Sequence, residues 1–208
     1  MDPISEIDPN ALPTADMTEA GTVERALTLL GPHIAWTIAT GHKPIENRHF
    51  RIRPGVYALH VGAGASRHDV YKMCKKNVKD LPGLVEIKGM KKCIVGAFEV
   101  AYAITLEEAM KHPRSQPWSS GPFCNVITRS VLFDKKDFIK DVKGKLSTWT
   151  MDNYTRDRFN TTFALYQTPF YDSPAEDTKC LIPQLEQPGV GVGIGVGAVK
   201  RKRSDAEL

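Results

Sequence analysis

The hydrophobic and polar positions of the chain change period several times after residue 24, and each change predicts a new short element. Apolar residues that alternate with polar ones, in runs bounded by glycine or proline, are typical of half-buried strands. The longest run, 92–104, places its apolar residues on one face. This pattern predicts strands at 25–30, 46–52, 56–62, 92–104 and 123–133.

Residues that begin or end helices predict short helices between these strands. Pro32 suits a first helical turn, and Gly41 fits the position just past the end of that helix. A serine or threonine followed three residues later by an acidic residue can cap the start of a helix. Two such pairs occur, Ser66 with Asp69 and Thr105 with Glu108.

Short strands joined by turns and brief helices predict a small mixed α+β domain with a curled sheet or a small barrel. We expect this domain at 25–171, including a C-terminal extension that packs on the barrel. The apolar residues that suggest this packing are Phe159, Phe163, Leu165, Tyr166 and Phe170.

The two ends of the chain differ in composition from the middle. Residues 1–24 are rich in Pro, Asp and Glu and poor in aromatic residues, which predicts a disordered acidic segment. Residues 172–208 contain an alternating Gly/Val run, which favours a flexible tail. A basic cluster follows, which we interpret as a nuclear-import signal, with nonspecific RNA contact as the alternative. Its residues are Lys200, Arg201, Lys202 and Arg203.

Composition argues against several functional classes. The sequence has no run of about 18 apolar residues, so no membrane partner is expected, and its acidic first residues resemble neither a secretory signal nor a transit peptide. The four cysteines form no Cys-x-x-Cys pair, which favours free thiols and argues against a zinc site or another metal cofactor. The expected location is intracellular, in the nucleus or the cytoplasm, and the basic cluster favours the nucleus.

The net charge of +4 conceals an asymmetry between the first residues and the rest. Residues 1–24 carry six acidic residues and no basic one, so the remaining chain holds all 28 Lys and Arg against 18 of the 24 Asp and Glu. A domain this basic favours a polyanionic partner, nucleic acid first. Simple solubility is the alternative explanation.

One short segment concentrates charged groups where the first helix runs into a strand. Lys43, Glu46 and Arg48 fall within six residues, and on a strand Glu46 and Arg48 project to the same face. A carboxylate between two cations can orient the arginine, and together they can hydrogen-bond the polar edge of a base beside a phosphate. A solvated surface cluster is the alternative.

The sequence around these residues resembles a known family. Residues 26–62, ALTLLGPHIAWTIATGHKPIENRHFRIRPGVYALHVG, are similar to the start of an ASCH domain, a branch of the PUA-like barrel superfamily. That family carries the pattern Gly-x-Lys-x-x-Glu-x-Arg, and the four fixed positions match. They are Gly41, Lys43, Glu46 and Arg48. The resemblance continues more loosely to about residue 151.

The resemblance implies a small PUA-like β-barrel with short peripheral helices and a cleft under the motif. It implies binding of RNA or of another single-stranded nucleic acid, with a base or nucleotide held in that cleft. Two alternatives stay open, because a fold does not fix an activity. One is a hydrolase, an amidohydrolase or a nuclease, that acts on modified nucleosides or RNA. The other is a protein-interaction module in transcription or RNA processing.

The chain departs from the hydrolytic branch of this family at one position. The members that remove an acetyl group from cytidine carry a threonine, the presumed nucleophile, where this chain has Glu46. Glutamate does not replace a threonine nucleophile without a different mechanism. Thr37 and Thr40 are the nearest hydroxyls, and both lie on the expected helix. We therefore favour a binding module over an enzyme.

Further candidates lie outside the motif. His60 is expected beside the cleft, where it contacts a phosphate or serves as a structural histidine. Trp118 lies in a Pro/Ser/Gly loop, where we expect an exposed ring that stacks on bases or, alternatively, a lid over the core. Arg129, Lys143 and Lys145 are expected to follow a phosphate backbone, unless they form a solvated face.

Overall fold

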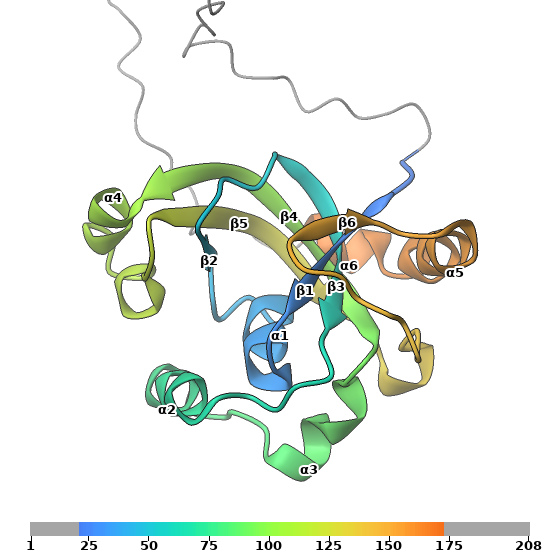
Figure 1. Cartoon of the computed structure of the whole chain (residues 1–208), viewed down its shortest axis with the longest axis horizontal. Coiled ribbons are helices and arrows are strands. Elements are labelled where there is room, and N and C mark those ends of the chain that lie inside the picture. Colours follow the sequence, from blue (N-terminus) through green and yellow to red (C-terminus); the bar gives the residue numbers. More distant parts are fainter. Residues whose placement is uncertain (1–20, 173–208) are drawn as a thin grey trace, which may run out of the picture.

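The computed structural model describes residues 21–172, with side chains through residue 170. This part of the chain is a mixed α+β domain whose six-stranded sheet curls into a half-barrel with short helices around it (Figure 1). Most of the expected acidic segment, nearly all of the expected tail and the basic cluster at 200–203 lie outside the described residues.

The sheet has the strand order β2-β5-β4-β3-β1-β6, and within it only β1 and β3 pair in parallel. Each strand expected from the sequence is present, although β2 ends at Arg48 rather than at residue 52, and a short β6 adds one edge. The strands are β1 (Arg25–Leu29), β2 (Ile45–Arg48), β3 (Gly55–Val61), β4 (Ile94–Thr105), β5 (Phe123–Leu132) and β6 (Thr148–Thr150).

The curl of the sheet follows from shifts in the register of its central strands. The pairing of β3 with β4 shifts between Leu59 and His60, and the pairing of β4 with β5 shifts around Val100. Such bulges bend a strand and increase its twist. β4 therefore supplies Phe98 to one apolar cluster and Ile104 to a second one, and does not form the single apolar face expected from the sequence.

Short helices fill the connections between the strands. The first helix begins at Pro32, and Gly41 follows it in a left-handed conformation (φ 76°), as predicted. The helices are α1 (Pro32–Ala39), α2 (His68–Asn77), α3 (Leu84–Ile87), α4 (Leu106–Met110), α5 (Asn153–Ala164) and α6 (Gln167–Asp172), with 3-10 turns at Lys88–Met90, Gln116–Trp118 and Lys135–Asp137.

One of the two predicted caps is confirmed and the other is wrong. Thr105 Oγ1 accepts from the backbone N–H of Glu108, whose carboxylate accepts from the backbone N–H of Thr105. Ser66 does not cap α2, which begins after Arg67 without a side-chain cap. The Ser66 hydroxyl instead lies 2.8 Å from Nδ1 of the buried His33, so a tertiary contact takes the place of the local one.

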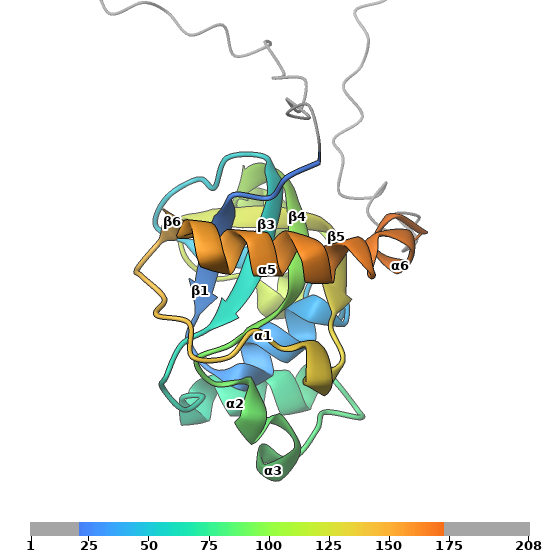
Figure 2. The same cartoon turned by 90° about the vertical axis from the view of Figure 1, so that its right-hand side faces the viewer.

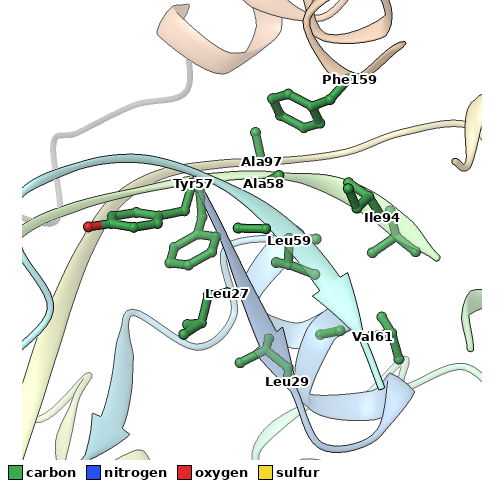
Figure 3. Packing of buried hydrophobic residues seen from close by; sticks show 14 of the residues in the cluster. Leu27, Leu29, Tyr57, Ala58, Leu59, Val61, Ile94, Ala97 and Phe159 are labelled. Carbon is green, nitrogen blue, oxygen red and sulfur yellow. The ribbon is translucent and has the colours of Figure 1, made fainter. Parts of the chain in front are cut away.

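The convex face of the sheet is covered by α5, which crosses it in Figure 2. Figure 3 shows Phe159 on the α5 side of Ala97, while Leu27 and Leu59 point into the core on the other side of the sheet. Phe163 and Phe170 are buried beside Phe159, which bears out the expected packing of the C-terminal extension. Leu165 is the exception, since it is 73% exposed.

Hydrogen bonds join the N-terminal part of the described domain to its C-terminal helix α5. The side-chain amide of Asn160 in α5 accepts from the N–H of Val23 at 2.8 Å and donates to the carbonyl of Val23 at 3.0 Å. One side chain thus binds both backbone groups of a residue just before β1, as a neighbouring strand does. The segment that enters the sheet is therefore held by the helix that covers the sheet.

No helix within residues 21–172 combines the length and the apolar character that a membrane crossing requires. Cys74, Cys93 and Cys124 are buried and free, in agreement with the expectation of free thiols.

We expect Phe159→Ala to lower the free energy of unfolding by about 3–5 kcal/mol, because the ring is fully buried against the sheet and its removal leaves a cavity. Urea unfolding followed by circular dichroism measures the change. Leu165→Ala, in the exposed residue that follows α5, is the control and should stay within about 0.5 kcal/mol of the parent protein. Equal stability of the two variants would show that α5 is not part of the cooperative unit.

Candidate functional site

Three charged side chains meet where α1 gives way to β2. Gly41 turns the chain out of the helix, and the backbone N–H of Lys43 then donates to the carbonyl of Thr37 at 2.9 Å. Along β2, residues two apart project to the same side. This places Glu46 and Arg48 next to each other, and Lys43 reaches the same carboxylate. The convergence of the three groups that the sequence suggests is present in the structure.

Glu46 holds the two cations through separate oxygens. Lys43 Nζ donates to Glu46 Oε2 at 3.0 Å and to the carbonyl of Ile45, and Arg48 Nε lies 3.0 Å from Glu46 Oε1. Lys43 and Glu46 are buried, and Lys43 is only 2% exposed. Buried charges are tolerated when they are paired, and each of these has a partner of opposite sign. We call Lys43, Glu46 and Arg48 the charged triad.

Arg48 differs from its two partners because it reaches the surface with donors to spare. Its Nη2 donates to the carbonyl of Thr28 at 2.9 Å, which joins β2 at one edge of the sheet to β1. The side chain is 19% exposed. Its Nε is buried and faces Glu46, whereas Nη1 is not buried and has no hydrogen-bond partner among residues 21–172. A guanidinium has five N–H donors, so Arg48 can bind an outside acceptor while Glu46 fixes its orientation.

Thr28 links the charged triad to a second polar group. Its hydroxyl lies 3.0 Å from His60 Nδ1 and accepts from Trp149 Nε1 at 3.0 Å, while His60 Nε2 lies 3.1 Å from the carbonyl of Val142. Since a carbonyl only accepts, Nε2 carries the proton and Nδ1 accepts from Thr28. Burial lowers the pKa of His60, and the hydrogen bond to Val142 opposes this in part. The ring is therefore neutral at neutral pH.

Two candidates from the sequence lie inside the fold. His60 is buried with both ring nitrogens bonded, which is the structural histidine that the sequence left as an alternative. The expected exposure of Trp118 is wrong, since the residue is 3% exposed and packs against Ile45 and its neighbours. The residue ends the 3-10 turn Gln116–Trp118, and its carbonyl accepts from Asn47 Nδ2. Trp118 fits the lid over the core, not the stacking platform.

The expected backbone-contacting residues fall into two groups. Arg129 on β5 lies 3.5 Å from the carboxylate of Glu99 on β4, where it forms an ion pair within the sheet. Lys143 and Lys145 are exposed and flank Gly144. A Cβ at Gly144 would collide with the ring of His60, so this loop lies directly against the Thr28–His60 pair. Gly144, which lies between the two lysines, and Arg48 of the charged triad thus both contact Thr28.

Sequence reasoning missed two features of this region. Thr28 carries no recognisable motif, because its role depends on the parallel pairing of β1 with β3 that sets it opposite His60. The second feature is a row of exposed lysines on α2 and just after its end, for which the signal was the i, i+3, i+4, i+7 spacing of residues on one helix face. These lysines are Lys72, Lys75, Lys76 and Lys79.

Other chemistry receives little support from the described residues. The hydroxyls of Thr37 and Thr40 donate to the carbonyls of Ile34 and Trp36 in their own helix. Between residues 21 and 172, no three His, Cys, Asp or Glu side chains are grouped so as to hold a metal ion. The charged triad itself offers hydrogen-bonding groups and charge.

We expect Glu46→Gln to lower the free energy of unfolding by about 3 kcal/mol, because it leaves two cations without their shared carboxylate. The change is isosteric, so no cavity contributes. Glu107→Gln makes the same substitution in an exposed ion pair with Lys111 and should cost less than about 1 kcal/mol. Urea unfolding of the two variants measures the difference, and equal stabilities would contradict the buried pairing.

Stability should fall as the pH is lowered below the ordinary histidine pKa of about 6.5. Burial lowers the pKa of both His33 and His60 in the folded protein, so the unfolded chain binds protons first. The free energy of unfolding should be level above about pH 7 and decline from about pH 6.5 down through the folded-state pKa values. Urea titrations at pH values across this range measure the decline in the free energy of unfolding. We expect His60→Gln to reduce that decline, and an unchanged slope in this variant would contradict the role of His60.

Comparison with known proteins identifies no relative. No protein-family model matches the chain, and no curated protein matches its sequence.

Proposed function

We propose that this domain binds single-stranded nucleic acid, RNA in the first place, with a base or nucleotide held against the charged triad. The observation that carries the proposal is the state of Arg48. Its guanidinium is oriented by the buried Glu46, anchored to the Thr28 carbonyl, partly exposed, and left with unused donors. On this proposal the half-barrel is PUA-like, and the Gly41-to-Arg48 motif is that of an ASCH domain.

The chemistry of Arg48 suits a nucleotide ligand. A fixed planar guanidinium donates two parallel hydrogen bonds to a phosphate or to the acceptor edge of a base, and its face stacks on a base. Glu46 is mostly used by Lys43 and Arg48, so its role is to position the arginine. Lys43, with its Nζ buried on Glu46 and Ile45, contributes charge and rigidity.

The surroundings favour a polyanion. Lys143 and Lys145 are exposed on the loop that lies against the Thr28–His60 pair, at a place where a phosphate backbone leaving Arg48 would pass. The exposed lysines of α2 and Lys79 just after it form no ion pair with the described residues, so their charge is available to a partner. Their helix packs on α1, the element that leads into the charged triad.

The two alternatives predict different behaviour. A hydrolase acting on modified nucleosides would turn over an acetylated or otherwise modified nucleoside many times per protein molecule, and a binding module would not. A protein-interaction module would bind RNA weakly and without a strong response to salt, since the response to salt reports phosphate contacts.

We expect RNA binding, measured by fluorescence anisotropy of a labelled single strand, to depend strongly on salt. If about four phosphates are contacted, the logarithm of the affinity should fall with the logarithm of salt concentration with a slope near ~−3. Arg48→Ala should weaken binding by about tenfold or more while the protein stays folded, because it removes the donors that face the ligand.

Arg156→Ala is the matched control. It removes one positive charge from α5 on the convex face, beside Asp157, and should bind RNA like the parent protein. Arg48→Lys keeps the charge but not the planar fork, and should lie between the two. A flat salt response would contradict the electrostatic part of the proposal. Collapse of thermal stability in Arg48→Ala would make the charged triad a structural network instead.

A further inference from the structure

The segment before β6 is held against the site by several contacts. We call residues 141–147 the front loop; in Figure 1 it is the yellow-orange chain that leads into β6. Val142 is fixed twice, since its N–H donates to the carbonyl of Lys92 at 2.9 Å and its carbonyl accepts from His60. Gly144 leaves no room for a Cβ, because the His60 ring and the Thr28 hydroxyl fill that place.

Backbone strain is concentrated in and beside this loop. Three non-glycine residues of the described chain have a positive φ, namely Lys92 at 57°, Asp141 at 60° and Ser147 at 65°. Asp141 and Ser147 bound the front loop, and the carbonyl of Lys92 accepts from the N–H of Val142 within it. Such conformations cost energy for residues with a Cβ and persist only where the surroundings impose them. The fold therefore imposes one conformation on the front loop.

That conformation presents an apolar side chain to the outside. Leu146 is 89% exposed, next to Ser147, and it follows the exposed Lys143 and Lys145. Single exposed leucines are common on protein surfaces, and Leu165 is another one here. Leu146 is distinguished by its setting, an imposed backbone conformation with two cations in the same loop.

The front loop and the charged triad share one residue as their common neighbour. Thr28 accepts from Arg48 through its carbonyl, and its hydroxyl lies against Gly144 of the front loop. A ligand that is bound to Arg48 and continues past Thr28 therefore reaches the front loop. A single nucleotide is too small to use both, whereas a strand of two or more nucleotides offers a second base.

We propose that the front loop is a second binding site for single-stranded nucleic acid, in which Leu146 packs on the face of the base next to the one at Arg48. Lys143 and Lys145 bind the phosphates on either side of that base. Apolar side chains pack on base faces without regard to sequence, because every base has such a face. The inference rests on the proposed function. It adds that a dinucleotide is the smallest ligand that occupies both the charged triad and the front loop.

The test compares Leu146→Ala with Leu165→Ala, two substitutions at exposed leucines, in the full chain. The probes are a fluorescent single-stranded RNA and a fluorescent mononucleotide, both measured by anisotropy. Leu146→Ala should weaken binding of the RNA about five- to tenfold and leave binding of the mononucleotide unchanged. Leu165→Ala should match the parent protein with both probes. Because Leu146 packs on little within the protein, its thermal unfolding should match as well.

The outcomes separate this inference from the function on which it rests. If the parent protein binds the RNA, Arg48→Ala loses it and Leu146→Ala binds normally, the front-loop site is overturned and the proposed function stands. If Leu146→Ala weakens the mononucleotide as much as the RNA, the leucine acts at the first base and the second-site inference is also overturned. If the parent protein binds neither probe, the proposed function itself is overturned.

Discussion

A buried carboxylate is stable only when opposite charges neutralise it, and Glu46 meets this requirement through ion pairs with Lys43 and Arg48. Each carboxylate oxygen of Glu46 faces a different cation, which restricts the orientation of both the Lys43 and the Arg48 side chain. Lys43 is thereby fixed beside the end of α1, and Arg48 is directed across to the carbonyl of Thr28. One charge thus determines how α1, β2 and β1 meet.

The same interaction connects the two apolar clusters of the domain. Ile45 of β2 belongs to the cluster around Trp118, and Leu27 of β1 belongs to the larger cluster under α5. Apolar contacts are not directional, so packing alone fixes the relative position of two clusters only loosely. The hydrogen bond from Arg48 to the Thr28 carbonyl supplies direction, which is how buried polar networks specify one arrangement.

Local sequence predicted what depends on neighbours along the chain. The strands, the start of α1, the cap at Thr105 and the meeting of Glu46 with Arg48 follow from spacings of a few residues. What depends on distant segments was not predictable. Ser66 contacts His33 and does not cap its own helix, Thr28 acquires its role from pairing with β3, and Trp118 turns inward because apolar partners from other elements surround it.

The two hydrogen bonds between the Asn160 side chain and the backbone of Val23 affect the order in which the sheet is completed during synthesis of the chain. β1 leaves the ribosome before the other described strands, yet it pairs with β6, and Val23 shortly before it is held by α5. Domains whose contacts join distant segments fold slowly, because a long loop must close before those contacts form. Translation therefore has to pass residue 160 before β1 and the residues just before it have β3, β6 and α5 as partners. Until then the nascent chain keeps an incomplete sheet edge, which is the kind of surface that chaperones cover.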